Sequence, residues 1–216
     1  MSSAKYIIFD FDGTIADTID LAINIYNGIS HEYGCKQVGE EDREMLGKSR
    51  SRDLMKEHGI SNLKLARILL RMRKEMGNPA HLLKPVPYIT DSLKDLKRQG
   101  YNMGILTSNS VTNVRAFLAS NGLSDLFDFV YSGKGLFGKD KVLERLVHKE
   151  KIARGNVIYV GDEARDIEAS KKAGVPVIAV TWGLNHRDVL SALDPDQIAD
   201  TPGDILRCVL RLGSQG

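Results

Sequence analysis

The sequence predicts an α/β protein, with a Rossmann-like, doubly wound parallel sheet core and an inserted α-helical cap domain. Two observations lead to this fold class. Over the C-terminal two thirds of the 216 residues, short apolar runs alternate with amphipathic stretches, which is typical of βαβ units. From about residue 17 to residue 83 that alternation stops, and helical patterns follow one another without a strand-like run. We therefore expect a core domain formed by residues 1–16 and 84–216, and a cap domain formed by residues 17–83.

Five short apolar runs are the predicted buried strands. They are residues 6–9, 103–106, 127–131, 157–160 and 177–180. Amphipathic stretches predict the helices of the core, which are residues 111–121, 141–151, 164–173 and 204–212. In the cap, the spacing of apolar residues between Ile19 and Tyr26, and again over residues 63–76, predicts two further helices.

The composition is that of an ordinary globular protein. Hydrophobic residues make up 42% of the chain, and the formal net charge of +2 is too small to indicate nucleic-acid binding. Cys35 and Cys208 are far apart in sequence, which favours reduced thiols over a disulfide or a metal site. No segment has the roughly 20 apolar residues of a membrane span, and residues 1–5 carry no apolar signal region. We expect a soluble cytoplasmic protein, with neither nucleic acid nor a membrane as partner.

Two carboxylates, Asp10 and Asp12, directly follow the first predicted strand. Like charges this close raise one another's pKa unless a cation or hydrogen bonds compensate. At the carboxyl end of a strand in an α/β sheet, such a pair indicates a functional site.

Three further groups of polar residues lie at or just after the ends of predicted strands, or in the next loop. They are Thr107-Ser108-Asn109, Lys139, and Asp162 with Asp166. Because the carboxyl ends of parallel strands meet at one edge of the sheet, we expect these groups and the first aspartates to share one cleft. Glu163 and Arg165, which lie within the last group, are expected to pair on the surface.

This set of side chains suits phosphoryl transfer. Asp10, Asp12 and Asp162 supply the hard oxygen ligands that Mg²⁺ prefers. Asp10 is the candidate nucleophile, which would form an aspartyl phosphate, and Asp12 is the candidate acid and base. Lys139 and the metal would offset charge on the transferring phosphoryl group.

A phosphate site is predicted at the end of the second strand. Thr107 offers a hydroxyl group, and the backbone amides of Ser108 and Asn109 lie near a helix start, where anions bind well. We expect these three residues, together with Lys139, to bind the phosphate of a substrate.

These motifs resemble those of the haloacid dehalogenase superfamily. Asp10-Phe11-Asp12-Gly13-Thr14 is similar to its first motif, and Gly161-Asp162-x-x-x-Asp166 to its fourth; Thr107 and Lys139 match the second and third. The resemblance implies a metal held by the side chains of Asp10 and Asp162 and by the backbone carbonyl of Asp12. It also implies that Asp166 supports the metal or Lys139.

Within that superfamily, the inserted helices resemble the cap of the phosphoglycolate phosphatase and β-phosphoglucomutase branch. Residues 12–18, 46–50, 179–183 and 199–202 are similar to segments of that branch, and the second of these places Arg50 in a loop that contacts substrate. The third motif in many relatives is Lys-Pro, whereas Asp140 follows Lys139 here. Lys134 and Lys141 therefore remain alternatives, and Lys139 is preferred because it precedes a predicted helix.

The expected function is Mg²⁺-dependent hydrolysis of a small phosphate monoester, such as a phosphoglycolate-like metabolite, by a monomer or homodimer. A phosphomutase, or a pyrophosphate or nucleotide phosphatase, remains an alternative. A dehalogenase or phosphonatase would be expected to lack the acid at Asp12. A non-catalytic binding protein is disfavoured because every candidate residue is intact.

Overall fold

The fold is built on one six-stranded parallel sheet, in a computed structural model that describes residues 6–50, 60–77, 79–133, 139–149, 152 and 154–214. The strands run in the order β3-β2-β1-β4-β5-β6. Their bounds are β1 (Tyr6–Phe9), β2 (Asn102–Thr107), β3 (Phe129–Ser132), β4 (Val157–Gly161), β5 (Val177–Val180) and β6 (Gln197–Ala199). The chain leaves β1 toward both edges, so the predicted doubly wound α/β fold is confirmed.

Helices cover both faces of this sheet. One face packs on α5 (Ile89–Arg98), α6 (Val111–Ser120) and α10 (Asp204–Gly213), and the other on α7 (Lys139–Lys149), α8 (Ala164–Ala173) and α9 (Arg187–Ser191). Short 3₁₀ turns occur at Ser30–Tyr33, Ala80–Leu82, Ser124–Leu126 and Arg154–Asn156.

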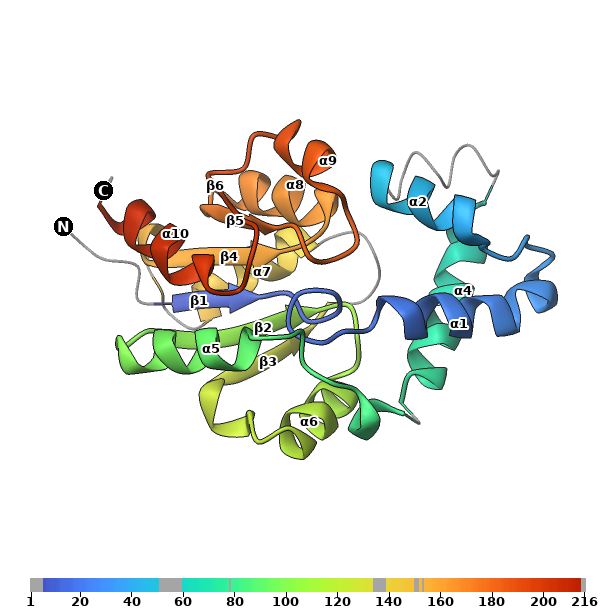
Figure 1. Ribbon diagram of the computed structural model, residues 1–216, viewed down its shortest axis with the longest axis horizontal. Helices are drawn as coiled ribbons and strands as arrows, with labels where there is room; N and C mark the ends of the chain where they lie inside the picture. The colour runs from blue at the N-terminus through green and yellow to red at the C-terminus, as the bar shows by residue number, and fades with distance from the viewer. Residues whose placement is uncertain are drawn as a thin grey trace.

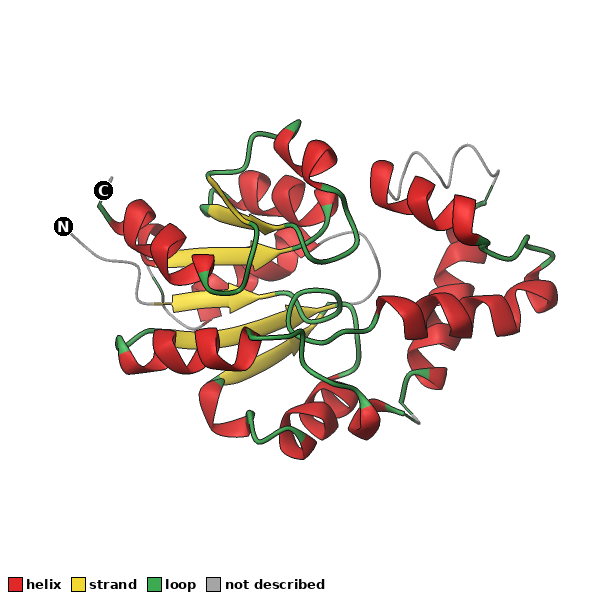
Figure 2. Ribbon diagram, viewed as in Figure 1, coloured by secondary structure: helices red, strands yellow, loops and turns green. Residues whose placement is uncertain are grey.

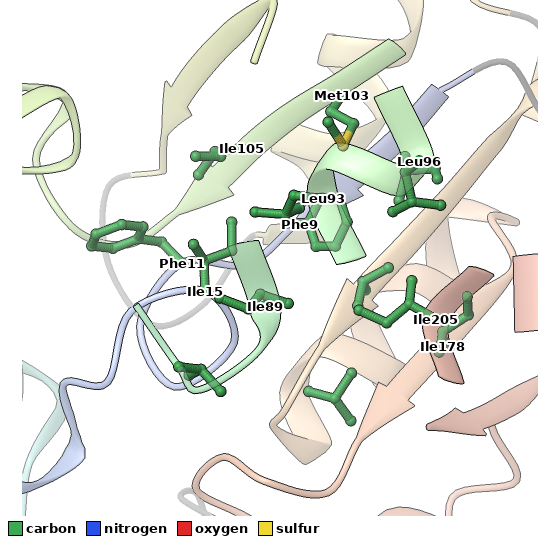
Figure 3. Packing of buried hydrophobic residues seen from close by; sticks show 14 of the residues in the cluster. Phe9, Phe11, Ile15, Ile89, Leu93, Leu96, Met103, Ile105, Ile178 and Ile205 are labelled. Atoms are coloured by element: carbon green, nitrogen blue, oxygen red, sulfur yellow. The ribbon is translucent and has the colours of Figure 1, made fainter. Parts of the chain in front are cut away.

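The two faces follow from alternation along the strands. Ile7 and Phe9 belong to one buried cluster and Ile8 to the other, because successive strand side chains point to opposite faces. Figure 3 shows Phe9 packed among Leu93 of α5 and neighbouring strand residues. A strand that is buried on both faces has to be apolar throughout, and for this reason β1, β4 and β5 can be recognised in the sequence.

Strand β6 and the helices α2, α5 and α9 were not expected from the sequence. Strand β6 has only three residues, and α2 (Glu40–Lys48) is strongly polar, with a single buried residue, Gly47. Helix α5 carries a clear apolar stripe at Ile89, Leu93 and Leu96, a spacing of four and three residues that predicts a helix once it is noticed. Helix α7 begins at Lys139, two residues before the predicted start.

Within the described part of the chain, three helices lie to one side of the sheet, beyond the carboxyl ends of its strands (Figure 1). They are α1 (Ile19–Ile29), α2 and α4 (Asn62–Glu75). The strand arrows in Figure 2 point toward them. Both connections to the sheet run together, since the Asp17 N–H donates to the Lys84 carbonyl at 3.0 Å and Ala16 bridges Pro85. The domain bounds at residues 16/17 and 83/84 stay a prediction. Within the described residues, no helix is both long and apolar enough to cross a membrane.

Candidate active site

Strand register brings the predicted site residues to one edge of the sheet. Phe9 is paired with Ile105 of β2 and Val160 of β4. The residues that follow on these three strands therefore lie side by side at their carboxyl ends. In this way Asp10, Thr107 and Asp162, far apart in sequence, become neighbours, and all three are buried.

In the loop after β1, successive side chains point alternately to the edge of the sheet and into the core. Phe11 turns into the core, where its ring meets Phe117 edge-on with centroids 5.0 Å apart. Asp10 stays at the edge, with its Oδ1 accepting the Phe11 N–H at 2.7 Å. Gly13 has a φ of +76°, and a Cβ there would lie 2.4 Å from Asp162 Oδ2. Only glycine satisfies both conditions, which explains its place in the motif.

Asp162 is held by hydrogen bonds to both of its carboxylate oxygens. Oδ1 accepts from the Thr14 hydroxyl at 2.7 Å, and Oδ2 accepts from the Leu184 N–H at 2.8 Å. Burial, followed by the charges of Glu163 and Asp10, raises the pKa of Asp162 well above its ordinary value. A carboxylate with this burial is stable in its charged form when a cation lies beside it.

Lys139 joins two of the predicted residues. Its Nζ lies 2.7 Å from Asp10 Oδ2 and 2.6 Å from Asp166 Oδ1, and all three side chains are at most 9% exposed. Burial raises the pKa of Asp10 to about 7, and Lys139 opposes this shift. Of the two alternative lysines, Lys141 is exposed on α7, whereas Lys134 lies outside the described residues.

Tyr159 packs against Lys139 and Asp166 and was not expected from the sequence to be near the site. Lys139 Nζ lies 5.4 Å from the centroid of its ring, and its hydroxyl is 3.5 Å from Asp166 Oδ1. It belongs to the apolar run of β4, so the sequence pattern indicates only a buried strand residue.

Asn109, which was expected to bind phosphate through its backbone amide, also contacts Asp12 through its side chain. Its Nδ2 donates to both carboxylate oxygens of Asp12, each at 3.2 Å, and its own N–H donates to Thr107 Oγ1 at 2.9 Å. Its Oδ1 accepts from Ser110 and Asn113, which fixes the side chain. Burial raises the pKa of Asp12, and the bond from Asn109 opposes that shift. Asn109 therefore orients the candidate acid and base.

Arg50 and the Glu163–Arg165 pair also have clear positions. Arg50 is exposed, and its Nη1 lies 3.6 Å from Glu168 Oε1 on α8. Glu163 and Arg165 do pair, but their side chains are only 10% and 18% exposed, so the predicted surface location is wrong. Glu163 precedes α8 and Arg165 lies in its first turn, next to buried Asp162, and this end of the helix is covered in the folded protein.

Arg73 of α4 reaches the residues that follow β2 and end β3. Its Nη2 donates to the Asn109 carbonyl at 2.8 Å and contacts the Ser132 hydroxyl. The sequence shows only that α4 is rich in basic residues. Which of them faces the sheet depends on how the helix docks.

The donor set fits a hard divalent cation. Asp10, Asp162 and Asp166 each offer a carboxylate oxygen, and the three oxygens lie within 4.8 Å of one another in a buried position. Each of the three carboxylates also accepts hydrogen bonds from protein donors, Asp166 from Lys139 and from the Glu163 N–H. Oxygen ligands of this kind suit Mg²⁺.

Comparisons with known proteins identify the family to which this chain belongs. The chain matches the haloacid dehalogenase-like hydrolase family over residues 7–180. It is 38% identical over 209 residues to a phosphoglycolate phosphatase of Synechococcus elongatus, covering 97% of this chain and 99% of that protein. It is 26% identical to the pyrophosphatase PpaX of Bacillus mycoides, covering 95% of this chain and 97% of that protein.

A solved structure supports the fold. A predicted phosphatase from Clostridium acetobutylicum superimposes with a TM-score of 0.83 at 19% identity, covering 97% of this chain and all of that one. With motifs, fold and family match in agreement, the chain belongs to the haloacid dehalogenase-like hydrolases. The resemblance drawn from the sequence is confirmed.

Proposed function

We propose that this protein is a Mg²⁺-dependent phosphatase that hydrolyses a small phosphate monoester through an aspartyl phosphate on Asp10. The proposal is based on the observation that the two aspartates have different partners. Asp10 is paired with the ammonium group of Lys139, whereas Asp12 is hydrogen-bonded to the amide of Asn109. The ammonium group beside Asp10 favours the ionised form that a nucleophile needs, and the amide of Asn109 holds the carboxyl group of Asp12 in place for proton transfer.

In the first step, a carboxylate oxygen of Asp10 forms a bond to phosphorus as the bond from phosphorus to the ester oxygen breaks. Asp12 gives its proton to the departing oxygen. Lys139 keeps Asp10 charged and offsets negative charge on the phosphoryl oxygens. When bound, Mg²⁺ would neutralise further charge on the transferring group.

In the second step, Asp12 takes a proton from water, and the water oxygen attacks the phosphorus of the aspartyl phosphate. The bond from phosphorus to Asp10 breaks, which releases phosphate and restores both aspartates. Thr107, with the backbone of Ser108, is proposed to bind the phosphate oxygens, and Arg50 to contact substrate from the cap.

The proposed substrate is 2-phosphoglycolate or a similarly small anionic ester. The support is the 38% identical relative named for that activity. Pyrophosphate is the second candidate, on the basis of the 26% identical relative named a pyrophosphatase. We propose the cytoplasm as the location of the reaction.

A substrate panel with Mg²⁺ tests the proposal. Phosphate release is measured for 2-phosphoglycolate, sugar phosphates, pyrophosphate and nucleotides. We expect the highest kcat/KM for 2-phosphoglycolate. Conversion of a sugar 1-phosphate to its 6-phosphate without phosphate release would instead identify a mutase, and no turnover of any ester would contradict the proposal.

A further inference from the structure

Asn185 lies between the fourth-motif loop and the cap. It follows β5 in the loop of residues 181–186 and is only 1% exposed. Its Oδ1 accepts the N–H of Ala164, the first residue of α8, at 2.8 Å. Its Nδ2 lies 3.1 Å from the carbonyl oxygen of Ser49 and 3.4 Å from those of Leu46 and Gly47.

The neighbours of Asn185 make the same connection. On the core side, the N–H groups of Leu184 and Asn185 donate to Asp162, at 2.8 Å to its Oδ2 and 3.3 Å to its carbonyl oxygen. On the cap side, the His186 N–H donates to the Gly47 carbonyl at 2.8 Å. Three consecutive residues therefore connect Asp162 to the end of α2.

The side chain of Asn185 is suited to this position for a chemical reason. A primary amide carries both an acceptor and two donors, so one side chain can accept from the core and donate to the cap. Aspartate has the same shape but lacks the donors, and it would set a negative oxygen against three carbonyl oxygens. Buried polar groups in such a position cost free energy when they are unpaired.

This contact also forms one wall of a cleft. A cavity of about 250 Å³ is lined by Asp17, Arg43 and Leu46 from one side and by Leu184 and His186 from the other, among others. The shape of the cavity depends on how the end of α2 packs against residues 184–186. A cleft of this size suits a small metabolite better than a drug-sized ligand.

We propose that Asn185 is a positioning residue that seats the cap segment of residues 46–49 on the loop holding Asp162. It acts through these neighbours and does not touch the reacting atoms. The position of the cap segment then determines how well a substrate fits the cleft, and in this way Asn185 contributes to discrimination between esters. This inference rests on the proposed phosphatase function.

The test compares Asn185→Asp with Asn121→Asp. Asn121 also donates through its Nδ2 to backbone carbonyls, those of Leu83 and Phe117, at the end of α6. With Mg²⁺ present, kcat/KM is measured for the preferred ester of the panel and for p-nitrophenyl phosphate. We expect Asn185→Asp to lower the ratio of the two values about tenfold, mainly through KM, as for one lost buried hydrogen-bonding group. Asn121→Asp should leave the ratio unchanged.

Hydrogen exchange provides a readout that does not need activity. In Asn185→Asp, amides of residues 40–50 should exchange faster while the strands keep their protection. If Asn185→Asp fails to fold, Gly47→Ala replaces it, because a Cβ there would lie 2.4 Å from His186 Nε2 and push the same segment away. Unchanged selectivity together with unchanged exchange at residues 40–50 would overturn the inference. A wild-type protein inactive on every ester would overturn the proposed function, whatever the exchange result.

Discussion

At the scale of single residues, the site is a set of buried charges whose balance decides the chemistry. Asp10, Asp162 and Asp166 crowd three carboxylates into one buried position, and Lys139 is placed among them. Burial alone would protonate such groups. The ammonium group makes it possible for Asp10 to remain an anion near neutral pH, where a nucleophile is needed.

Replacement of Lys139 tests this balance. Lys139→Met keeps most of the side-chain volume but leaves Asp10 and Asp166 without their cation, so we expect kcat to fall about 10²–10³-fold. The matched control is Lys141→Met, two residues along α7 and exposed, which should keep kcat within about twofold of wild type. Full activity in Lys139→Met, or a comparable loss in Lys141→Met, would reject Lys139 as the third-motif lysine.

Asn109 offers a second test at this scale. Asn109→Asp keeps the acceptor used by Ser110 and Asn113 but replaces the donor to Asp12 with a negative oxygen. Asp12 should then be misoriented and hold its proton more tightly, which lowers kcat about 10–100-fold, in the range of other lost orienting contacts. Steady-state kinetics check this, with Asn121→Asp as the control. A rate equal to that of the control would show that Asp12 does not depend on Asn109.

At the scale of elements, local sequence determines where several of the helices begin or end. Helix α8 ends at Gly174, whose φ is +65°, and α10 begins beside Thr201, whose N–H and hydroxyl both donate to Asp204 Oδ2. Such contacts lie within a few residues and are readable from sequence. The polar helix α2 has no comparable apolar stripe, and its position depends on contacts with the core.

The hydrogen bonds from Thr201 to Asp204 at the start of α10 should make the stability of the protein depend on pH. The Thr201 N–H lowers the pKa of Asp204 below its ordinary value of 3.8. A lowered folded-state pKa contributes stability above the unfolded pKa, and this contribution is lost as pH falls through the folded value. Asp204→Ala should therefore cost no more than about 1 kcal/mol near neutral pH, since a partly exposed carboxylate is screened by water.

Urea unfolding at several pH values measures this effect. The difference between wild type and Asp204→Ala should shrink as the pH is lowered below about 4. Asp188→Ala, which removes an exposed aspartate in the first turn of α9, serves as the control. A difference that grows toward low pH would contradict the assigned sign.

At the scale of the whole molecule, parallel topology explains why much of the site could be predicted. The apolar runs of β1, β2 and β4 indicate where each strand ends, and the sheet then brings Asp10, Thr107 and Asp162 together. What could not be predicted depends on side-chain partners distant in sequence. Examples are Arg73 on the Asn109 carbonyl and Asn185 on the cap segment, which are fixed only once the helices have docked.

The burial of the Glu163–Arg165 pair is another feature that local sequence does not predict. The pairing itself is local, but its burial comes from the surrounding fold. Likewise, α5 follows a readable apolar stripe, whereas three residues of β6 are too few to form a pattern. Local periodicity and topology therefore predict the arrangement of strands and helices, whereas the packing of the helices against the sheet determines which polar groups come into contact.

The most direct test of the account is to detect the phosphoryl group on Asp10. The Mg²⁺-loaded protein is mixed with the preferred ester, quenched in acid within the first turnover, and mapped by peptide mass spectrometry after reductive trapping of acyl phosphates. We predict one modified residue, Asp10, and no modification in Asp10→Asn. Exposed Asp91→Asn, as the control, should be modified like wild type. Turnover without a trapped group at Asp10, or an Asp10→Asn variant with full activity, would contradict the account.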